Sequence, residues 1–278
     1  MEALITRLEA PDGPVQVRVW PGEHAEPGAP VLLACHGWTD SGEVFGPLAE
    51  ALGRHWTVVA PDAPGHGGTP RRPGRFAVAD HAVGAQAVLD ALPKVAGRDV
   101  TVVVLGHSMG ALTATRVASA RPSIVAHLVL EDPARTTGRR PLSTAAMRAG
   151  LRAQADIDHT HLVAQVRAEH PDWPEAELDP WARSKREMDP TTVDEGADWG
   201  ASLTALLPDV AAPVLIVHGE LRRGGIVSPT AAARCAAACR TPVSVLRLPE
   251  AHCPRREAPA AFVAALRHVL QTACRPGA

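Results

Sequence analysis

Short apolar runs that alternate with helical patterns constrain the fold of this chain more than any other feature. The runs are continuously apolar and bounded by turn residues, which is typical of parallel strands that are buried on both faces. They occupy residues 15–20, 31–35, 56–60, 100–105, 127–130, 214–217 and 243–248. Helical patterns lie between them, at about 43–53, 79–92, 109–120, 229–239 and 258–272. This alternation predicts an α/β fold with a mostly parallel sheet flanked by helices.

One interval interrupts the alternation. Residues 137–207 contain no strand-like run, and their apolar residues recur at roughly helical spacing. Four prolines, at positions 171, 174, 180 and 190, predict breaks between short helices. Trp173, Trp181 and Trp199 also lie here, where they either line a site or pack the core of the interval itself. We therefore predict a core made of residues 1–136 and 208–278, with an inserted helical lid at 137–207.

Charge and cysteine content argue against several classes of partner. The 28 basic residues are scattered among 30 acidic ones, so no basic face for nucleic acid or a membrane surface stands out. The N-terminus has no apolar leader, and no stretch approaches the length that spans a bilayer. The five cysteines form no C-x-x-C pair and fit reduced thiols: Cys35, Cys235, Cys239, Cys253 and Cys274. These features predict a cytoplasmic protein that takes a small molecule and uses no metal or cofactor.

The motif that carries chemistry spans residues 106–110, which read Gly-His-Ser-Met-Gly. It follows an apolar strand pattern directly and opens a helical one, which is the context in which G-x-S-x-G marks a nucleophile. A serine on such a sharp turn projects clear of the sheet, while the helix N-terminus directs amide groups toward developing negative charge. The flanking glycines allow the turn, since a Cβ there would crowd a neighbouring element. The motif predicts Ser108 as the nucleophile.

Four motifs in fixed order extend this pattern over nearly the whole chain. They are His-Gly-Trp at 36–38, Pro-Asp-Ala-Pro-Gly-His-Gly at 61–67, the serine motif at 106–110, and His252 near the C-terminus. With these motifs the sequence resembles the α/β-hydrolase family, in particular its lidded, lactonase- and esterase-like members. The resemblance implies an oxyanion hole formed by the backbone amides of Trp38 and Met109. We expect His36, Asp62 and His66 to shape loops, and contact with substrate stays open for Asp62 and His66.

The base must be chosen among 13 histidines. The resemblance favours His252, because it follows the last strand pattern and precedes the last helix, where a loop can reach Ser108. His218 is the main rival, although it occupies the place of a structural His-Gly turn in the family. His107 is expected to pack beside the nucleophile, because neighbours in a sharp turn point apart.

The third member of a triad is where the sequence departs from the usual family pattern. Most relatives carry the acid at the position that Arg222 occupies here, and an arginine cannot orient an imidazole. Some members, including lipases and zearalenone-type lactonases, keep their acid after the strand that follows the serine, where this chain has Glu131 and Asp132. We favour Asp132 as the acid, and Glu220 and Glu131 stay open as alternatives, since the acid need only meet the histidine in space.

These residues predict a serine hydrolase that cleaves a carboxylic ester or lactone of a small, largely apolar substrate through an acyl-enzyme. A serine at position 108 argues against dehalogenase and epoxide-hydrolase chemistry, which needs a carboxylate there. Carbon–carbon bond hydrolysis is an alternative, favoured if arginines such as Arg222 or Arg223 face the pocket. A ligand receptor that has lost turnover is the non-enzymatic alternative, and a fluorophosphonate probe discriminates it, because only an activated serine labels.

Overall fold

The computed structural model describes residues 2–22, 31–53, 55–74, 76–96, 101–137, 145–193 and 197–273. Eight strands form one sheet in the order β1-β2-β4-β3-β5-β6-β7-β8. The strands are β1 (Leu4–Ala10), β2 (Gly13–Trp20), β3 (Val31–Cys35), β4 (Thr57–Pro61), β5 (Val102–His107), β6 (Val125–Glu131), β7 (Val214–His218) and β8 (Val243–Arg247). All neighbours from β4 to β8 pair in parallel, whereas β1 and β2 pair antiparallel with each other and β2 with β4. The predicted mostly parallel α/β sheet is confirmed.

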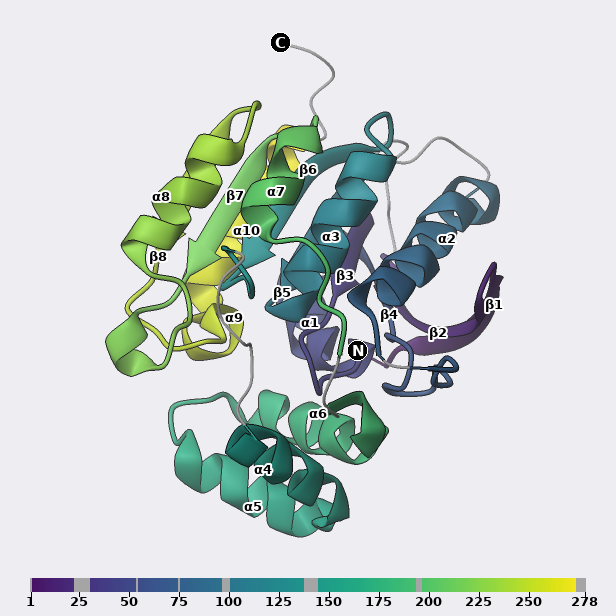
Figure 1. The fold of residues 1–278 in the computed structure, drawn as a ribbon, viewed down its shortest axis with the longest axis vertical. Coiled ribbons are helices and arrows are strands. Elements are labelled where there is room, and N and C mark those ends of the chain that lie inside the picture. The colour runs from purple at the N-terminus through teal and green to yellow at the C-terminus, as the bar shows by residue number, and fades with distance from the viewer. Residues whose placement is uncertain are drawn as a thin grey trace.

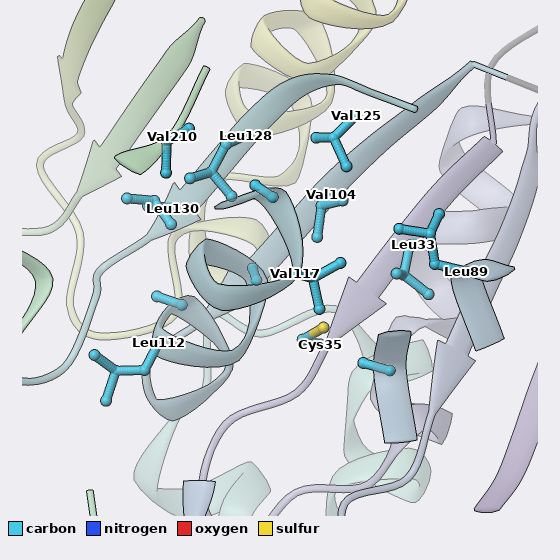
Figure 2. Packing of buried hydrophobic residues seen from close by; sticks show 14 of the residues in the cluster. Leu33, Cys35, Leu89, Val104, Leu112, Val117, Val125, Leu128, Leu130 and Val210 are labelled. Carbon is cyan, nitrogen blue, oxygen red and sulfur yellow. The ribbon is translucent and has the colours of Figure 1, made fainter. Parts of the chain in front are cut away.

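Helices cover both faces of this sheet (Figure 1). The flanking helices are α1 (Gly46–Leu52), α2 (Val78–Ala96), α3 (Met109–Ala120), α8 (Pro229–Ala238) and α10 (Pro259–Ala273). Neighbouring residues of a strand serve opposite faces. Leu33 of β3 packs in a cluster with Leu89 of α2 and Val117 of α3 (Figure 2). Leu32 packs on the other face with Phe262 of α10. Burial on both faces explains why these strands read as continuous apolar runs.

The two edge strands differ from that pattern. Strand β1 was not predicted from the sequence, because its residues are mostly exposed, including Leu4 and Ile5 at 63% and 64%, and so form no buried apolar run. At the other edge, β8 lies where an apolar run predicted it, but most of its residues are only partly buried or exposed. The buried pattern therefore identifies the central strands and is a weaker guide at the edges.

The chain between β6 and β7 contains α4 (Ala145–Asp156), α5 (His159–Glu169), α6 (Glu175–Arg186) and α7 (Leu203–Leu206). The first three helices gather beyond one end of the sheet (Figure 1). Pro180 lies inside α6, so the predicted break at this proline is wrong. Several residues of α6 are buried, and we attribute the continuous helix to their packing, which outweighs the lost hydrogen bond. The separate lid stays a prediction, and positions 138–144 and 194–196 within it lie outside the described residues.

Short helices complete the described chain: η1 (Gly42–Phe45), η2 (Pro190–Val193), η3 (Leu207–Asp209), η4 (Leu221–Arg223) and α9 (Pro254–Glu257). No helix in the described ranges combines the length and apolar character needed to cross a bilayer. The described cysteines are free thiols, and Cys274 lies outside the described residues.

Candidate active site

Ser108 occupies the sharp turn between β5 and α3, at the carboxyl end of the sheet. Its backbone has φ 51° and ψ −113°, an unfavourable conformation for a residue with a side chain. The flanking glycines explain how the turn closes. A Cβ on Gly106 would lie 2.2 Å from the carbonyl oxygen of Gly110, and one on Gly110 would lie 2.1 Å from that of Cys35. The helix therefore begins directly against the sheet, which fixes the position of the serine.

Asp132 and His252 meet across the ends of β6 and β8. The Asp132 Oδ2 atom lies 2.7 Å from His252 Nδ1, and the aspartate side chain is fully buried. The same carboxylate accepts hydrogen bonds from the backbone amides of Ile226 at 2.9 Å and Gly219 at 3.3 Å. These contacts orient the carboxylate toward the imidazole, and leave the other ring nitrogen, Nε2, for a second partner.

The other two candidate acids bind arginines. Glu220 forms ion pairs with Arg222 and with Arg247, the latter at 3.2 Å. Glu131 accepts two hydrogen bonds of 2.8 Å from Arg255, one from its backbone amide and one from its guanidinium. Of the three carboxylates, the structure thus brings Asp132 to His252.

The rival histidines make backbone contacts. The Nδ1 atom of His218 lies 2.8 Å from the carbonyl oxygen of Gly219, in the turn after β7. The Nε2 atom of His107 lies 3.1 Å from the carbonyl oxygen of His252, and the two rings lie 4.8 Å apart between centroids. Burial, together with the charge of Arg255, lowers the pKa of His107 well below its usual value. His107 is therefore a neutral residue that packs against the loop carrying His252.

The loop after β3 runs beside the serine. A Cβ on Gly37 would lie 3.4 Å from the Cβ of Ser108, so Trp38 follows at close range. Within the described ranges the backbone amides of Trp38 and Met109 donate to no protein acceptor. His36 and Asp62 are both fully buried. His36 Nε2 accepts from the amide of Ala63 at 2.9 Å, and Asp62 accepts from the amide of Gly42 at 2.7 Å and from the Arg18 guanidinium at 2.6 Å.

Residues 37–40 form a strained turn. The amide of Asp40 donates to the carbonyl oxygen of Gly37 at 3.1 Å, and Thr39 has φ +70°. A four-residue turn with positive φ at its third position normally places glycine or asparagine there. A β-branched residue in this conformation costs about 1–3 kcal/mol and persists only where surrounding contacts hold it.

Ser108 and His252 line one cavity of about 460 Å³. Among the described residues no hydrogen bond joins the Ser108 hydroxyl to the imidazole, and such contacts often tighten only when substrate binds. Aromatic and aliphatic side chains supply much of the wall, from the core and from the segment between β6 and β7: Trp38, Met147, Leu151, Trp173, Trp181, Trp199 and Ile226. Arg223 also lines it, whereas Arg222 does not.

A buried ion cluster adjoins this cavity, and sequence reasoning did not identify it. Lys185 of α6 lies 2.6 Å from Asp40 Oδ1, and Arg256 of α9 lies 3.4 Å from Asp40 Oδ2. Burial would raise the pKa of Asp40, but the charges of Lys185 and Arg256 outweigh burial and hold it well below its usual value. One signal was available, since Lys185 is one of only two lysines, with Lys94. Its partners lie too far along the chain for any local pattern to identify them.

Known proteins resemble this chain in sequence. The model of the alpha/beta hydrolase family matches residues 31–265. A serine hydrolase-like protein of Danio rerio is 30% identical over 159 residues, which cover 55% of this chain and 45% of that protein. The chain thus spans under half the length of that relative. The 2-(acetamidomethylene)succinate hydrolase of Mesorhizobium japonicum is 27% identical over 219 residues, covering 74% of this chain and 75% of that protein.

Solved structures share the fold over nearly the full chain. A crystal structure of E-2-(acetamidomethylene)succinate hydrolase matches with a TM-score of 0.73 and 22% identity, covering 97% of this chain and 100% of that one. The enol-lactonase from Burkholderia xenovorans matches with a TM-score of 0.72 and 18% identity, and the match covers 96% of this chain and 100% of that one. At these identities the likeness concerns the fold alone. Because the family model spans most of the sequence and the fold agrees with it, the chain belongs to the alpha/beta hydrolase family.

Proposed function

We propose that this hydrolase cleaves a carboxylic ester or lactone of a small, largely apolar substrate, with Ser108 as nucleophile, His252 as base and Asp132 as the acid. The observation that carries the proposal is the 2.7 Å contact between Asp132 Oδ2 and His252 Nδ1, beside a cavity that Ser108 also lines. A buried carboxylate on Nδ1 fixes the tautomer that leaves Nε2 free to accept a proton. The apolar wall of the cavity fits an apolar acyl or ring group.

The reaction takes two steps. The Ser108 hydroxyl attacks the carbonyl carbon while His252 Nε2 takes its proton, and the amides of Trp38 and Met109 hold the negative oxygen that forms. His252 then returns the proton to the leaving alcohol, which departs and leaves an acyl group on Ser108. A water molecule attacks that acyl group with His252 again as base, which releases the acid and restores the serine. None of these steps needs a metal or an organic cofactor.

The test compares turnover of p-nitrophenyl acetate and of a simple lactone by the wild type and by Ser108→Ala. We expect Ser108→Ala to lose turnover by several orders of magnitude and to resist a fluorophosphonate probe that labels the wild type. Ser119→Ala is the matched control, because Ser119 lies on the same helix and only donates to the carbonyl oxygen of Thr115. A folded wild type that neither hydrolyses these substrates nor labels would contradict the proposal.

Amide hydrolysis of an acidic substrate is a second candidate. The Mesorhizobium japonicum relative is named for a substrate with an acetamido group and two carboxylates. The position of Arg223 on the cavity wall favours a substrate carboxylate, because a guanidinium binds carboxylates well. Turnover of N-acetyl amides bearing a carboxylate, with Arg223→Met raising KM much more than it lowers kcat, would support this candidate. Because Arg223 lines the cavity, the same observation also favours carbon–carbon hydrolysis, which moves ahead if esters, lactones and amides all fail while dienoic keto acids react.

A further inference from the structure

The strained turn at residues 37–40 is held by a side chain from the segment between β6 and β7. The Nζ atom of Lys185 donates to the carbonyl oxygen of Thr39 at 3.0 Å, to the Thr39 hydroxyl at 3.1 Å, and to Asp40 Oδ1 at 2.6 Å. An ammonium group has three donors, so these contacts use all of them. Lys185 therefore has no hydrogen left for a substrate, although it borders the cavity.

The surroundings of Lys185 fit a fixed contact. Its side chain is 6% exposed and lies 5.2 Å from the centre of the Trp181 ring. Asp40 is held from the other side by Arg256, whose guanidinium also donates to Glu177 of α6 at 3.1 Å. Two residues of α6 thus contribute to this cluster: Lys185 contacts the turn directly, and Glu177 contacts Arg256, which pairs with Asp40.

The turn also carries one of the two proposed oxyanion donors. The Trp38 N–H lies in the Gly37–Trp38 peptide, one peptide group before the φ bond of Thr39. Because the hydrogen bond from Asp40 to Gly37 closes the turn, a relaxation of φ at Thr39 must be compensated by rotation about the backbone bonds of Trp38, which changes the direction of that N–H. Loss of one oxyanion donor lowers kcat by about 10²–10³-fold, and a small change in its direction costs part of that.

We propose that Lys185 is a positioning residue that holds the Gly37–Asp40 turn in its strained form, so that the Trp38 amide faces the negative oxygen formed at Ser108. This inference rests on the proposed function. It assigns α6 a direct part in the reaction: the helix completes the oxyanion hole by fixing the turn, in addition to covering the cavity.

The test combines Lys185→Met with Thr39→Gly. Without its ammonium clamp the threonine turn relaxes, so we expect Lys185→Met to lower kcat at least 10-fold with KM changed less than 3-fold, since the lost interaction acts in the transition state. Glycine adopts positive φ without strain and needs no clamp. Thr39→Gly in the Lys185→Met background should therefore restore at least a third of the wild-type kcat, so that Lys185→Met lowers kcat far less when Thr39→Gly is also present.

Inhibition by a trifluoromethyl ketone gives a second readout, because the serine adds to its carbonyl carbon and the ketone oxygen becomes negatively charged. Its Ki should rise in Lys185→Met by the same factor as kcat/KM falls, and recover in the double variant. Arg186→Met is the control, because Arg186 lies on the same helix, donates to the carbonyl oxygen of Ile157 at 3.1 Å, and does not line the cavity. If Lys185→Met does not fold, Lys185→Leu takes its place, because it also removes every donor to the turn.

The outcomes separate the two proposals. A wild type that is active through Ser108, with unchanged kcat and Ki in the folded Lys185 variant, overturns the clamp alone. A loss of kcat that Thr39→Gly does not restore also overturns it, because the effect then has another origin. A wild type that neither turns over nor labels with fluorophosphonate overturns both the proposed function and the clamp.

Discussion

Asp132 illustrates how the backbone places a single candidate catalytic side chain. It has φ +36°, a left-handed conformation that aspartate tolerates better than most residues, and its amide donates to the carbonyl oxygen of Val217 at 2.7 Å. That hydrogen bond ties the end of β6 to β7. Its carboxylate then meets two further amides and His252. The residue is fixed from four directions, which is what orientation of an imidazole requires.

Replacement of Asp132 by asparagine tests this role. The amide side chain would keep the shape of the aspartate but stabilise the wrong tautomer of His252, so we expect kcat for p-nitrophenyl acetate to fall on the order of 10⁴-fold with the protein still folded. Glu220→Gln is the matched control, because Glu220 pairs with Arg222 of η4 and with Arg247 at the end of β8. Its kcat should stay within about 3-fold of wild type. Equal losses in the two variants would remove Asp132 from the triad.

Three elements meet at a cluster of buried imidazoles. His36 follows β3, His66 lies in the loop after β4, and His81 lies in α2; the His36 ring centre is 5.3 Å from that of His66 and 5.2 Å from that of His81. Burial lowers the pKa of His66 to about 4 and that of His81 to about 3, and the imidazole of His66 adds to the shift for His81. These side chains are therefore packed in their neutral form, which joins the elements without buried charge.

The shift at His81 makes stability depend on pH. Its folded pKa lies below its ordinary value of 6.5, so between these values the unfolded chain binds more protons. The stabilisation is complete above pH 6.5 and is lost as the pH falls toward 3. From pH 7 to 5 this one group removes about 2 kcal/mol of unfolding free energy. We would measure the free energy of unfolding in urea at pH 7 and at pH 5. Between these pH values His81→Gln should lose about 2 kcal/mol less stability than the wild type.

The control for this comparison is His55→Gln, since His55 is exposed in the turn before β4. It should follow the wild-type pH dependence. Nearby carboxyl groups with raised pKa values, such as Asp62, act in the opposite direction but contribute equally to all three proteins. If His81→Gln and wild type lose the same stability between pH 7 and 5, the imidazole does not carry the dependence.

Thiol reactivity reports on the molecule as a whole. Cys35 lies in β3 at the centre of the sheet, and Cys235 lies in α8 against it; burial raises the pKa of each to about 12. At pH 8 about one thiol in 10⁴ of such groups is ionised, and the closed core blocks reagents. Both should react with iodoacetamide only when the whole fold opens.

Peptide mass spectrometry resolves this labelling by site. Cys239 is the internal reference, because it lies at the end of α8 and is only partly buried. In the native protein we expect Cys239 to label much faster than Cys35 and Cys235, and in concentrated urea we expect equal rates. Native labelling of Cys35 at the rate of Cys239 would show that the sheet opens locally.

The sequence by itself determined the central architecture and the position of the serine. Buried strands such as β3 and β5 leave a local signature, because each residue of a short run must be apolar to face helices on both sides. The turn at Ser108 is equally local, since the two glycines that permit it lie within two residues of it. Such features depend on neighbours in the chain, and a single sequence displays them directly.

Only the tertiary structure decided which groups meet. Asp132 and His252 are 120 positions apart, and Lys185 is 146 positions from the turn that it holds at Thr39. The sequence left three carboxylates open as the acid and gave no role to Lys185, because contact across such separations depends on how strands and helices stack. Strand β1 is a further feature that only the tertiary structure shows. Its residues are mostly exposed and form no apolar run, so it is identified by its antiparallel pairing with β2.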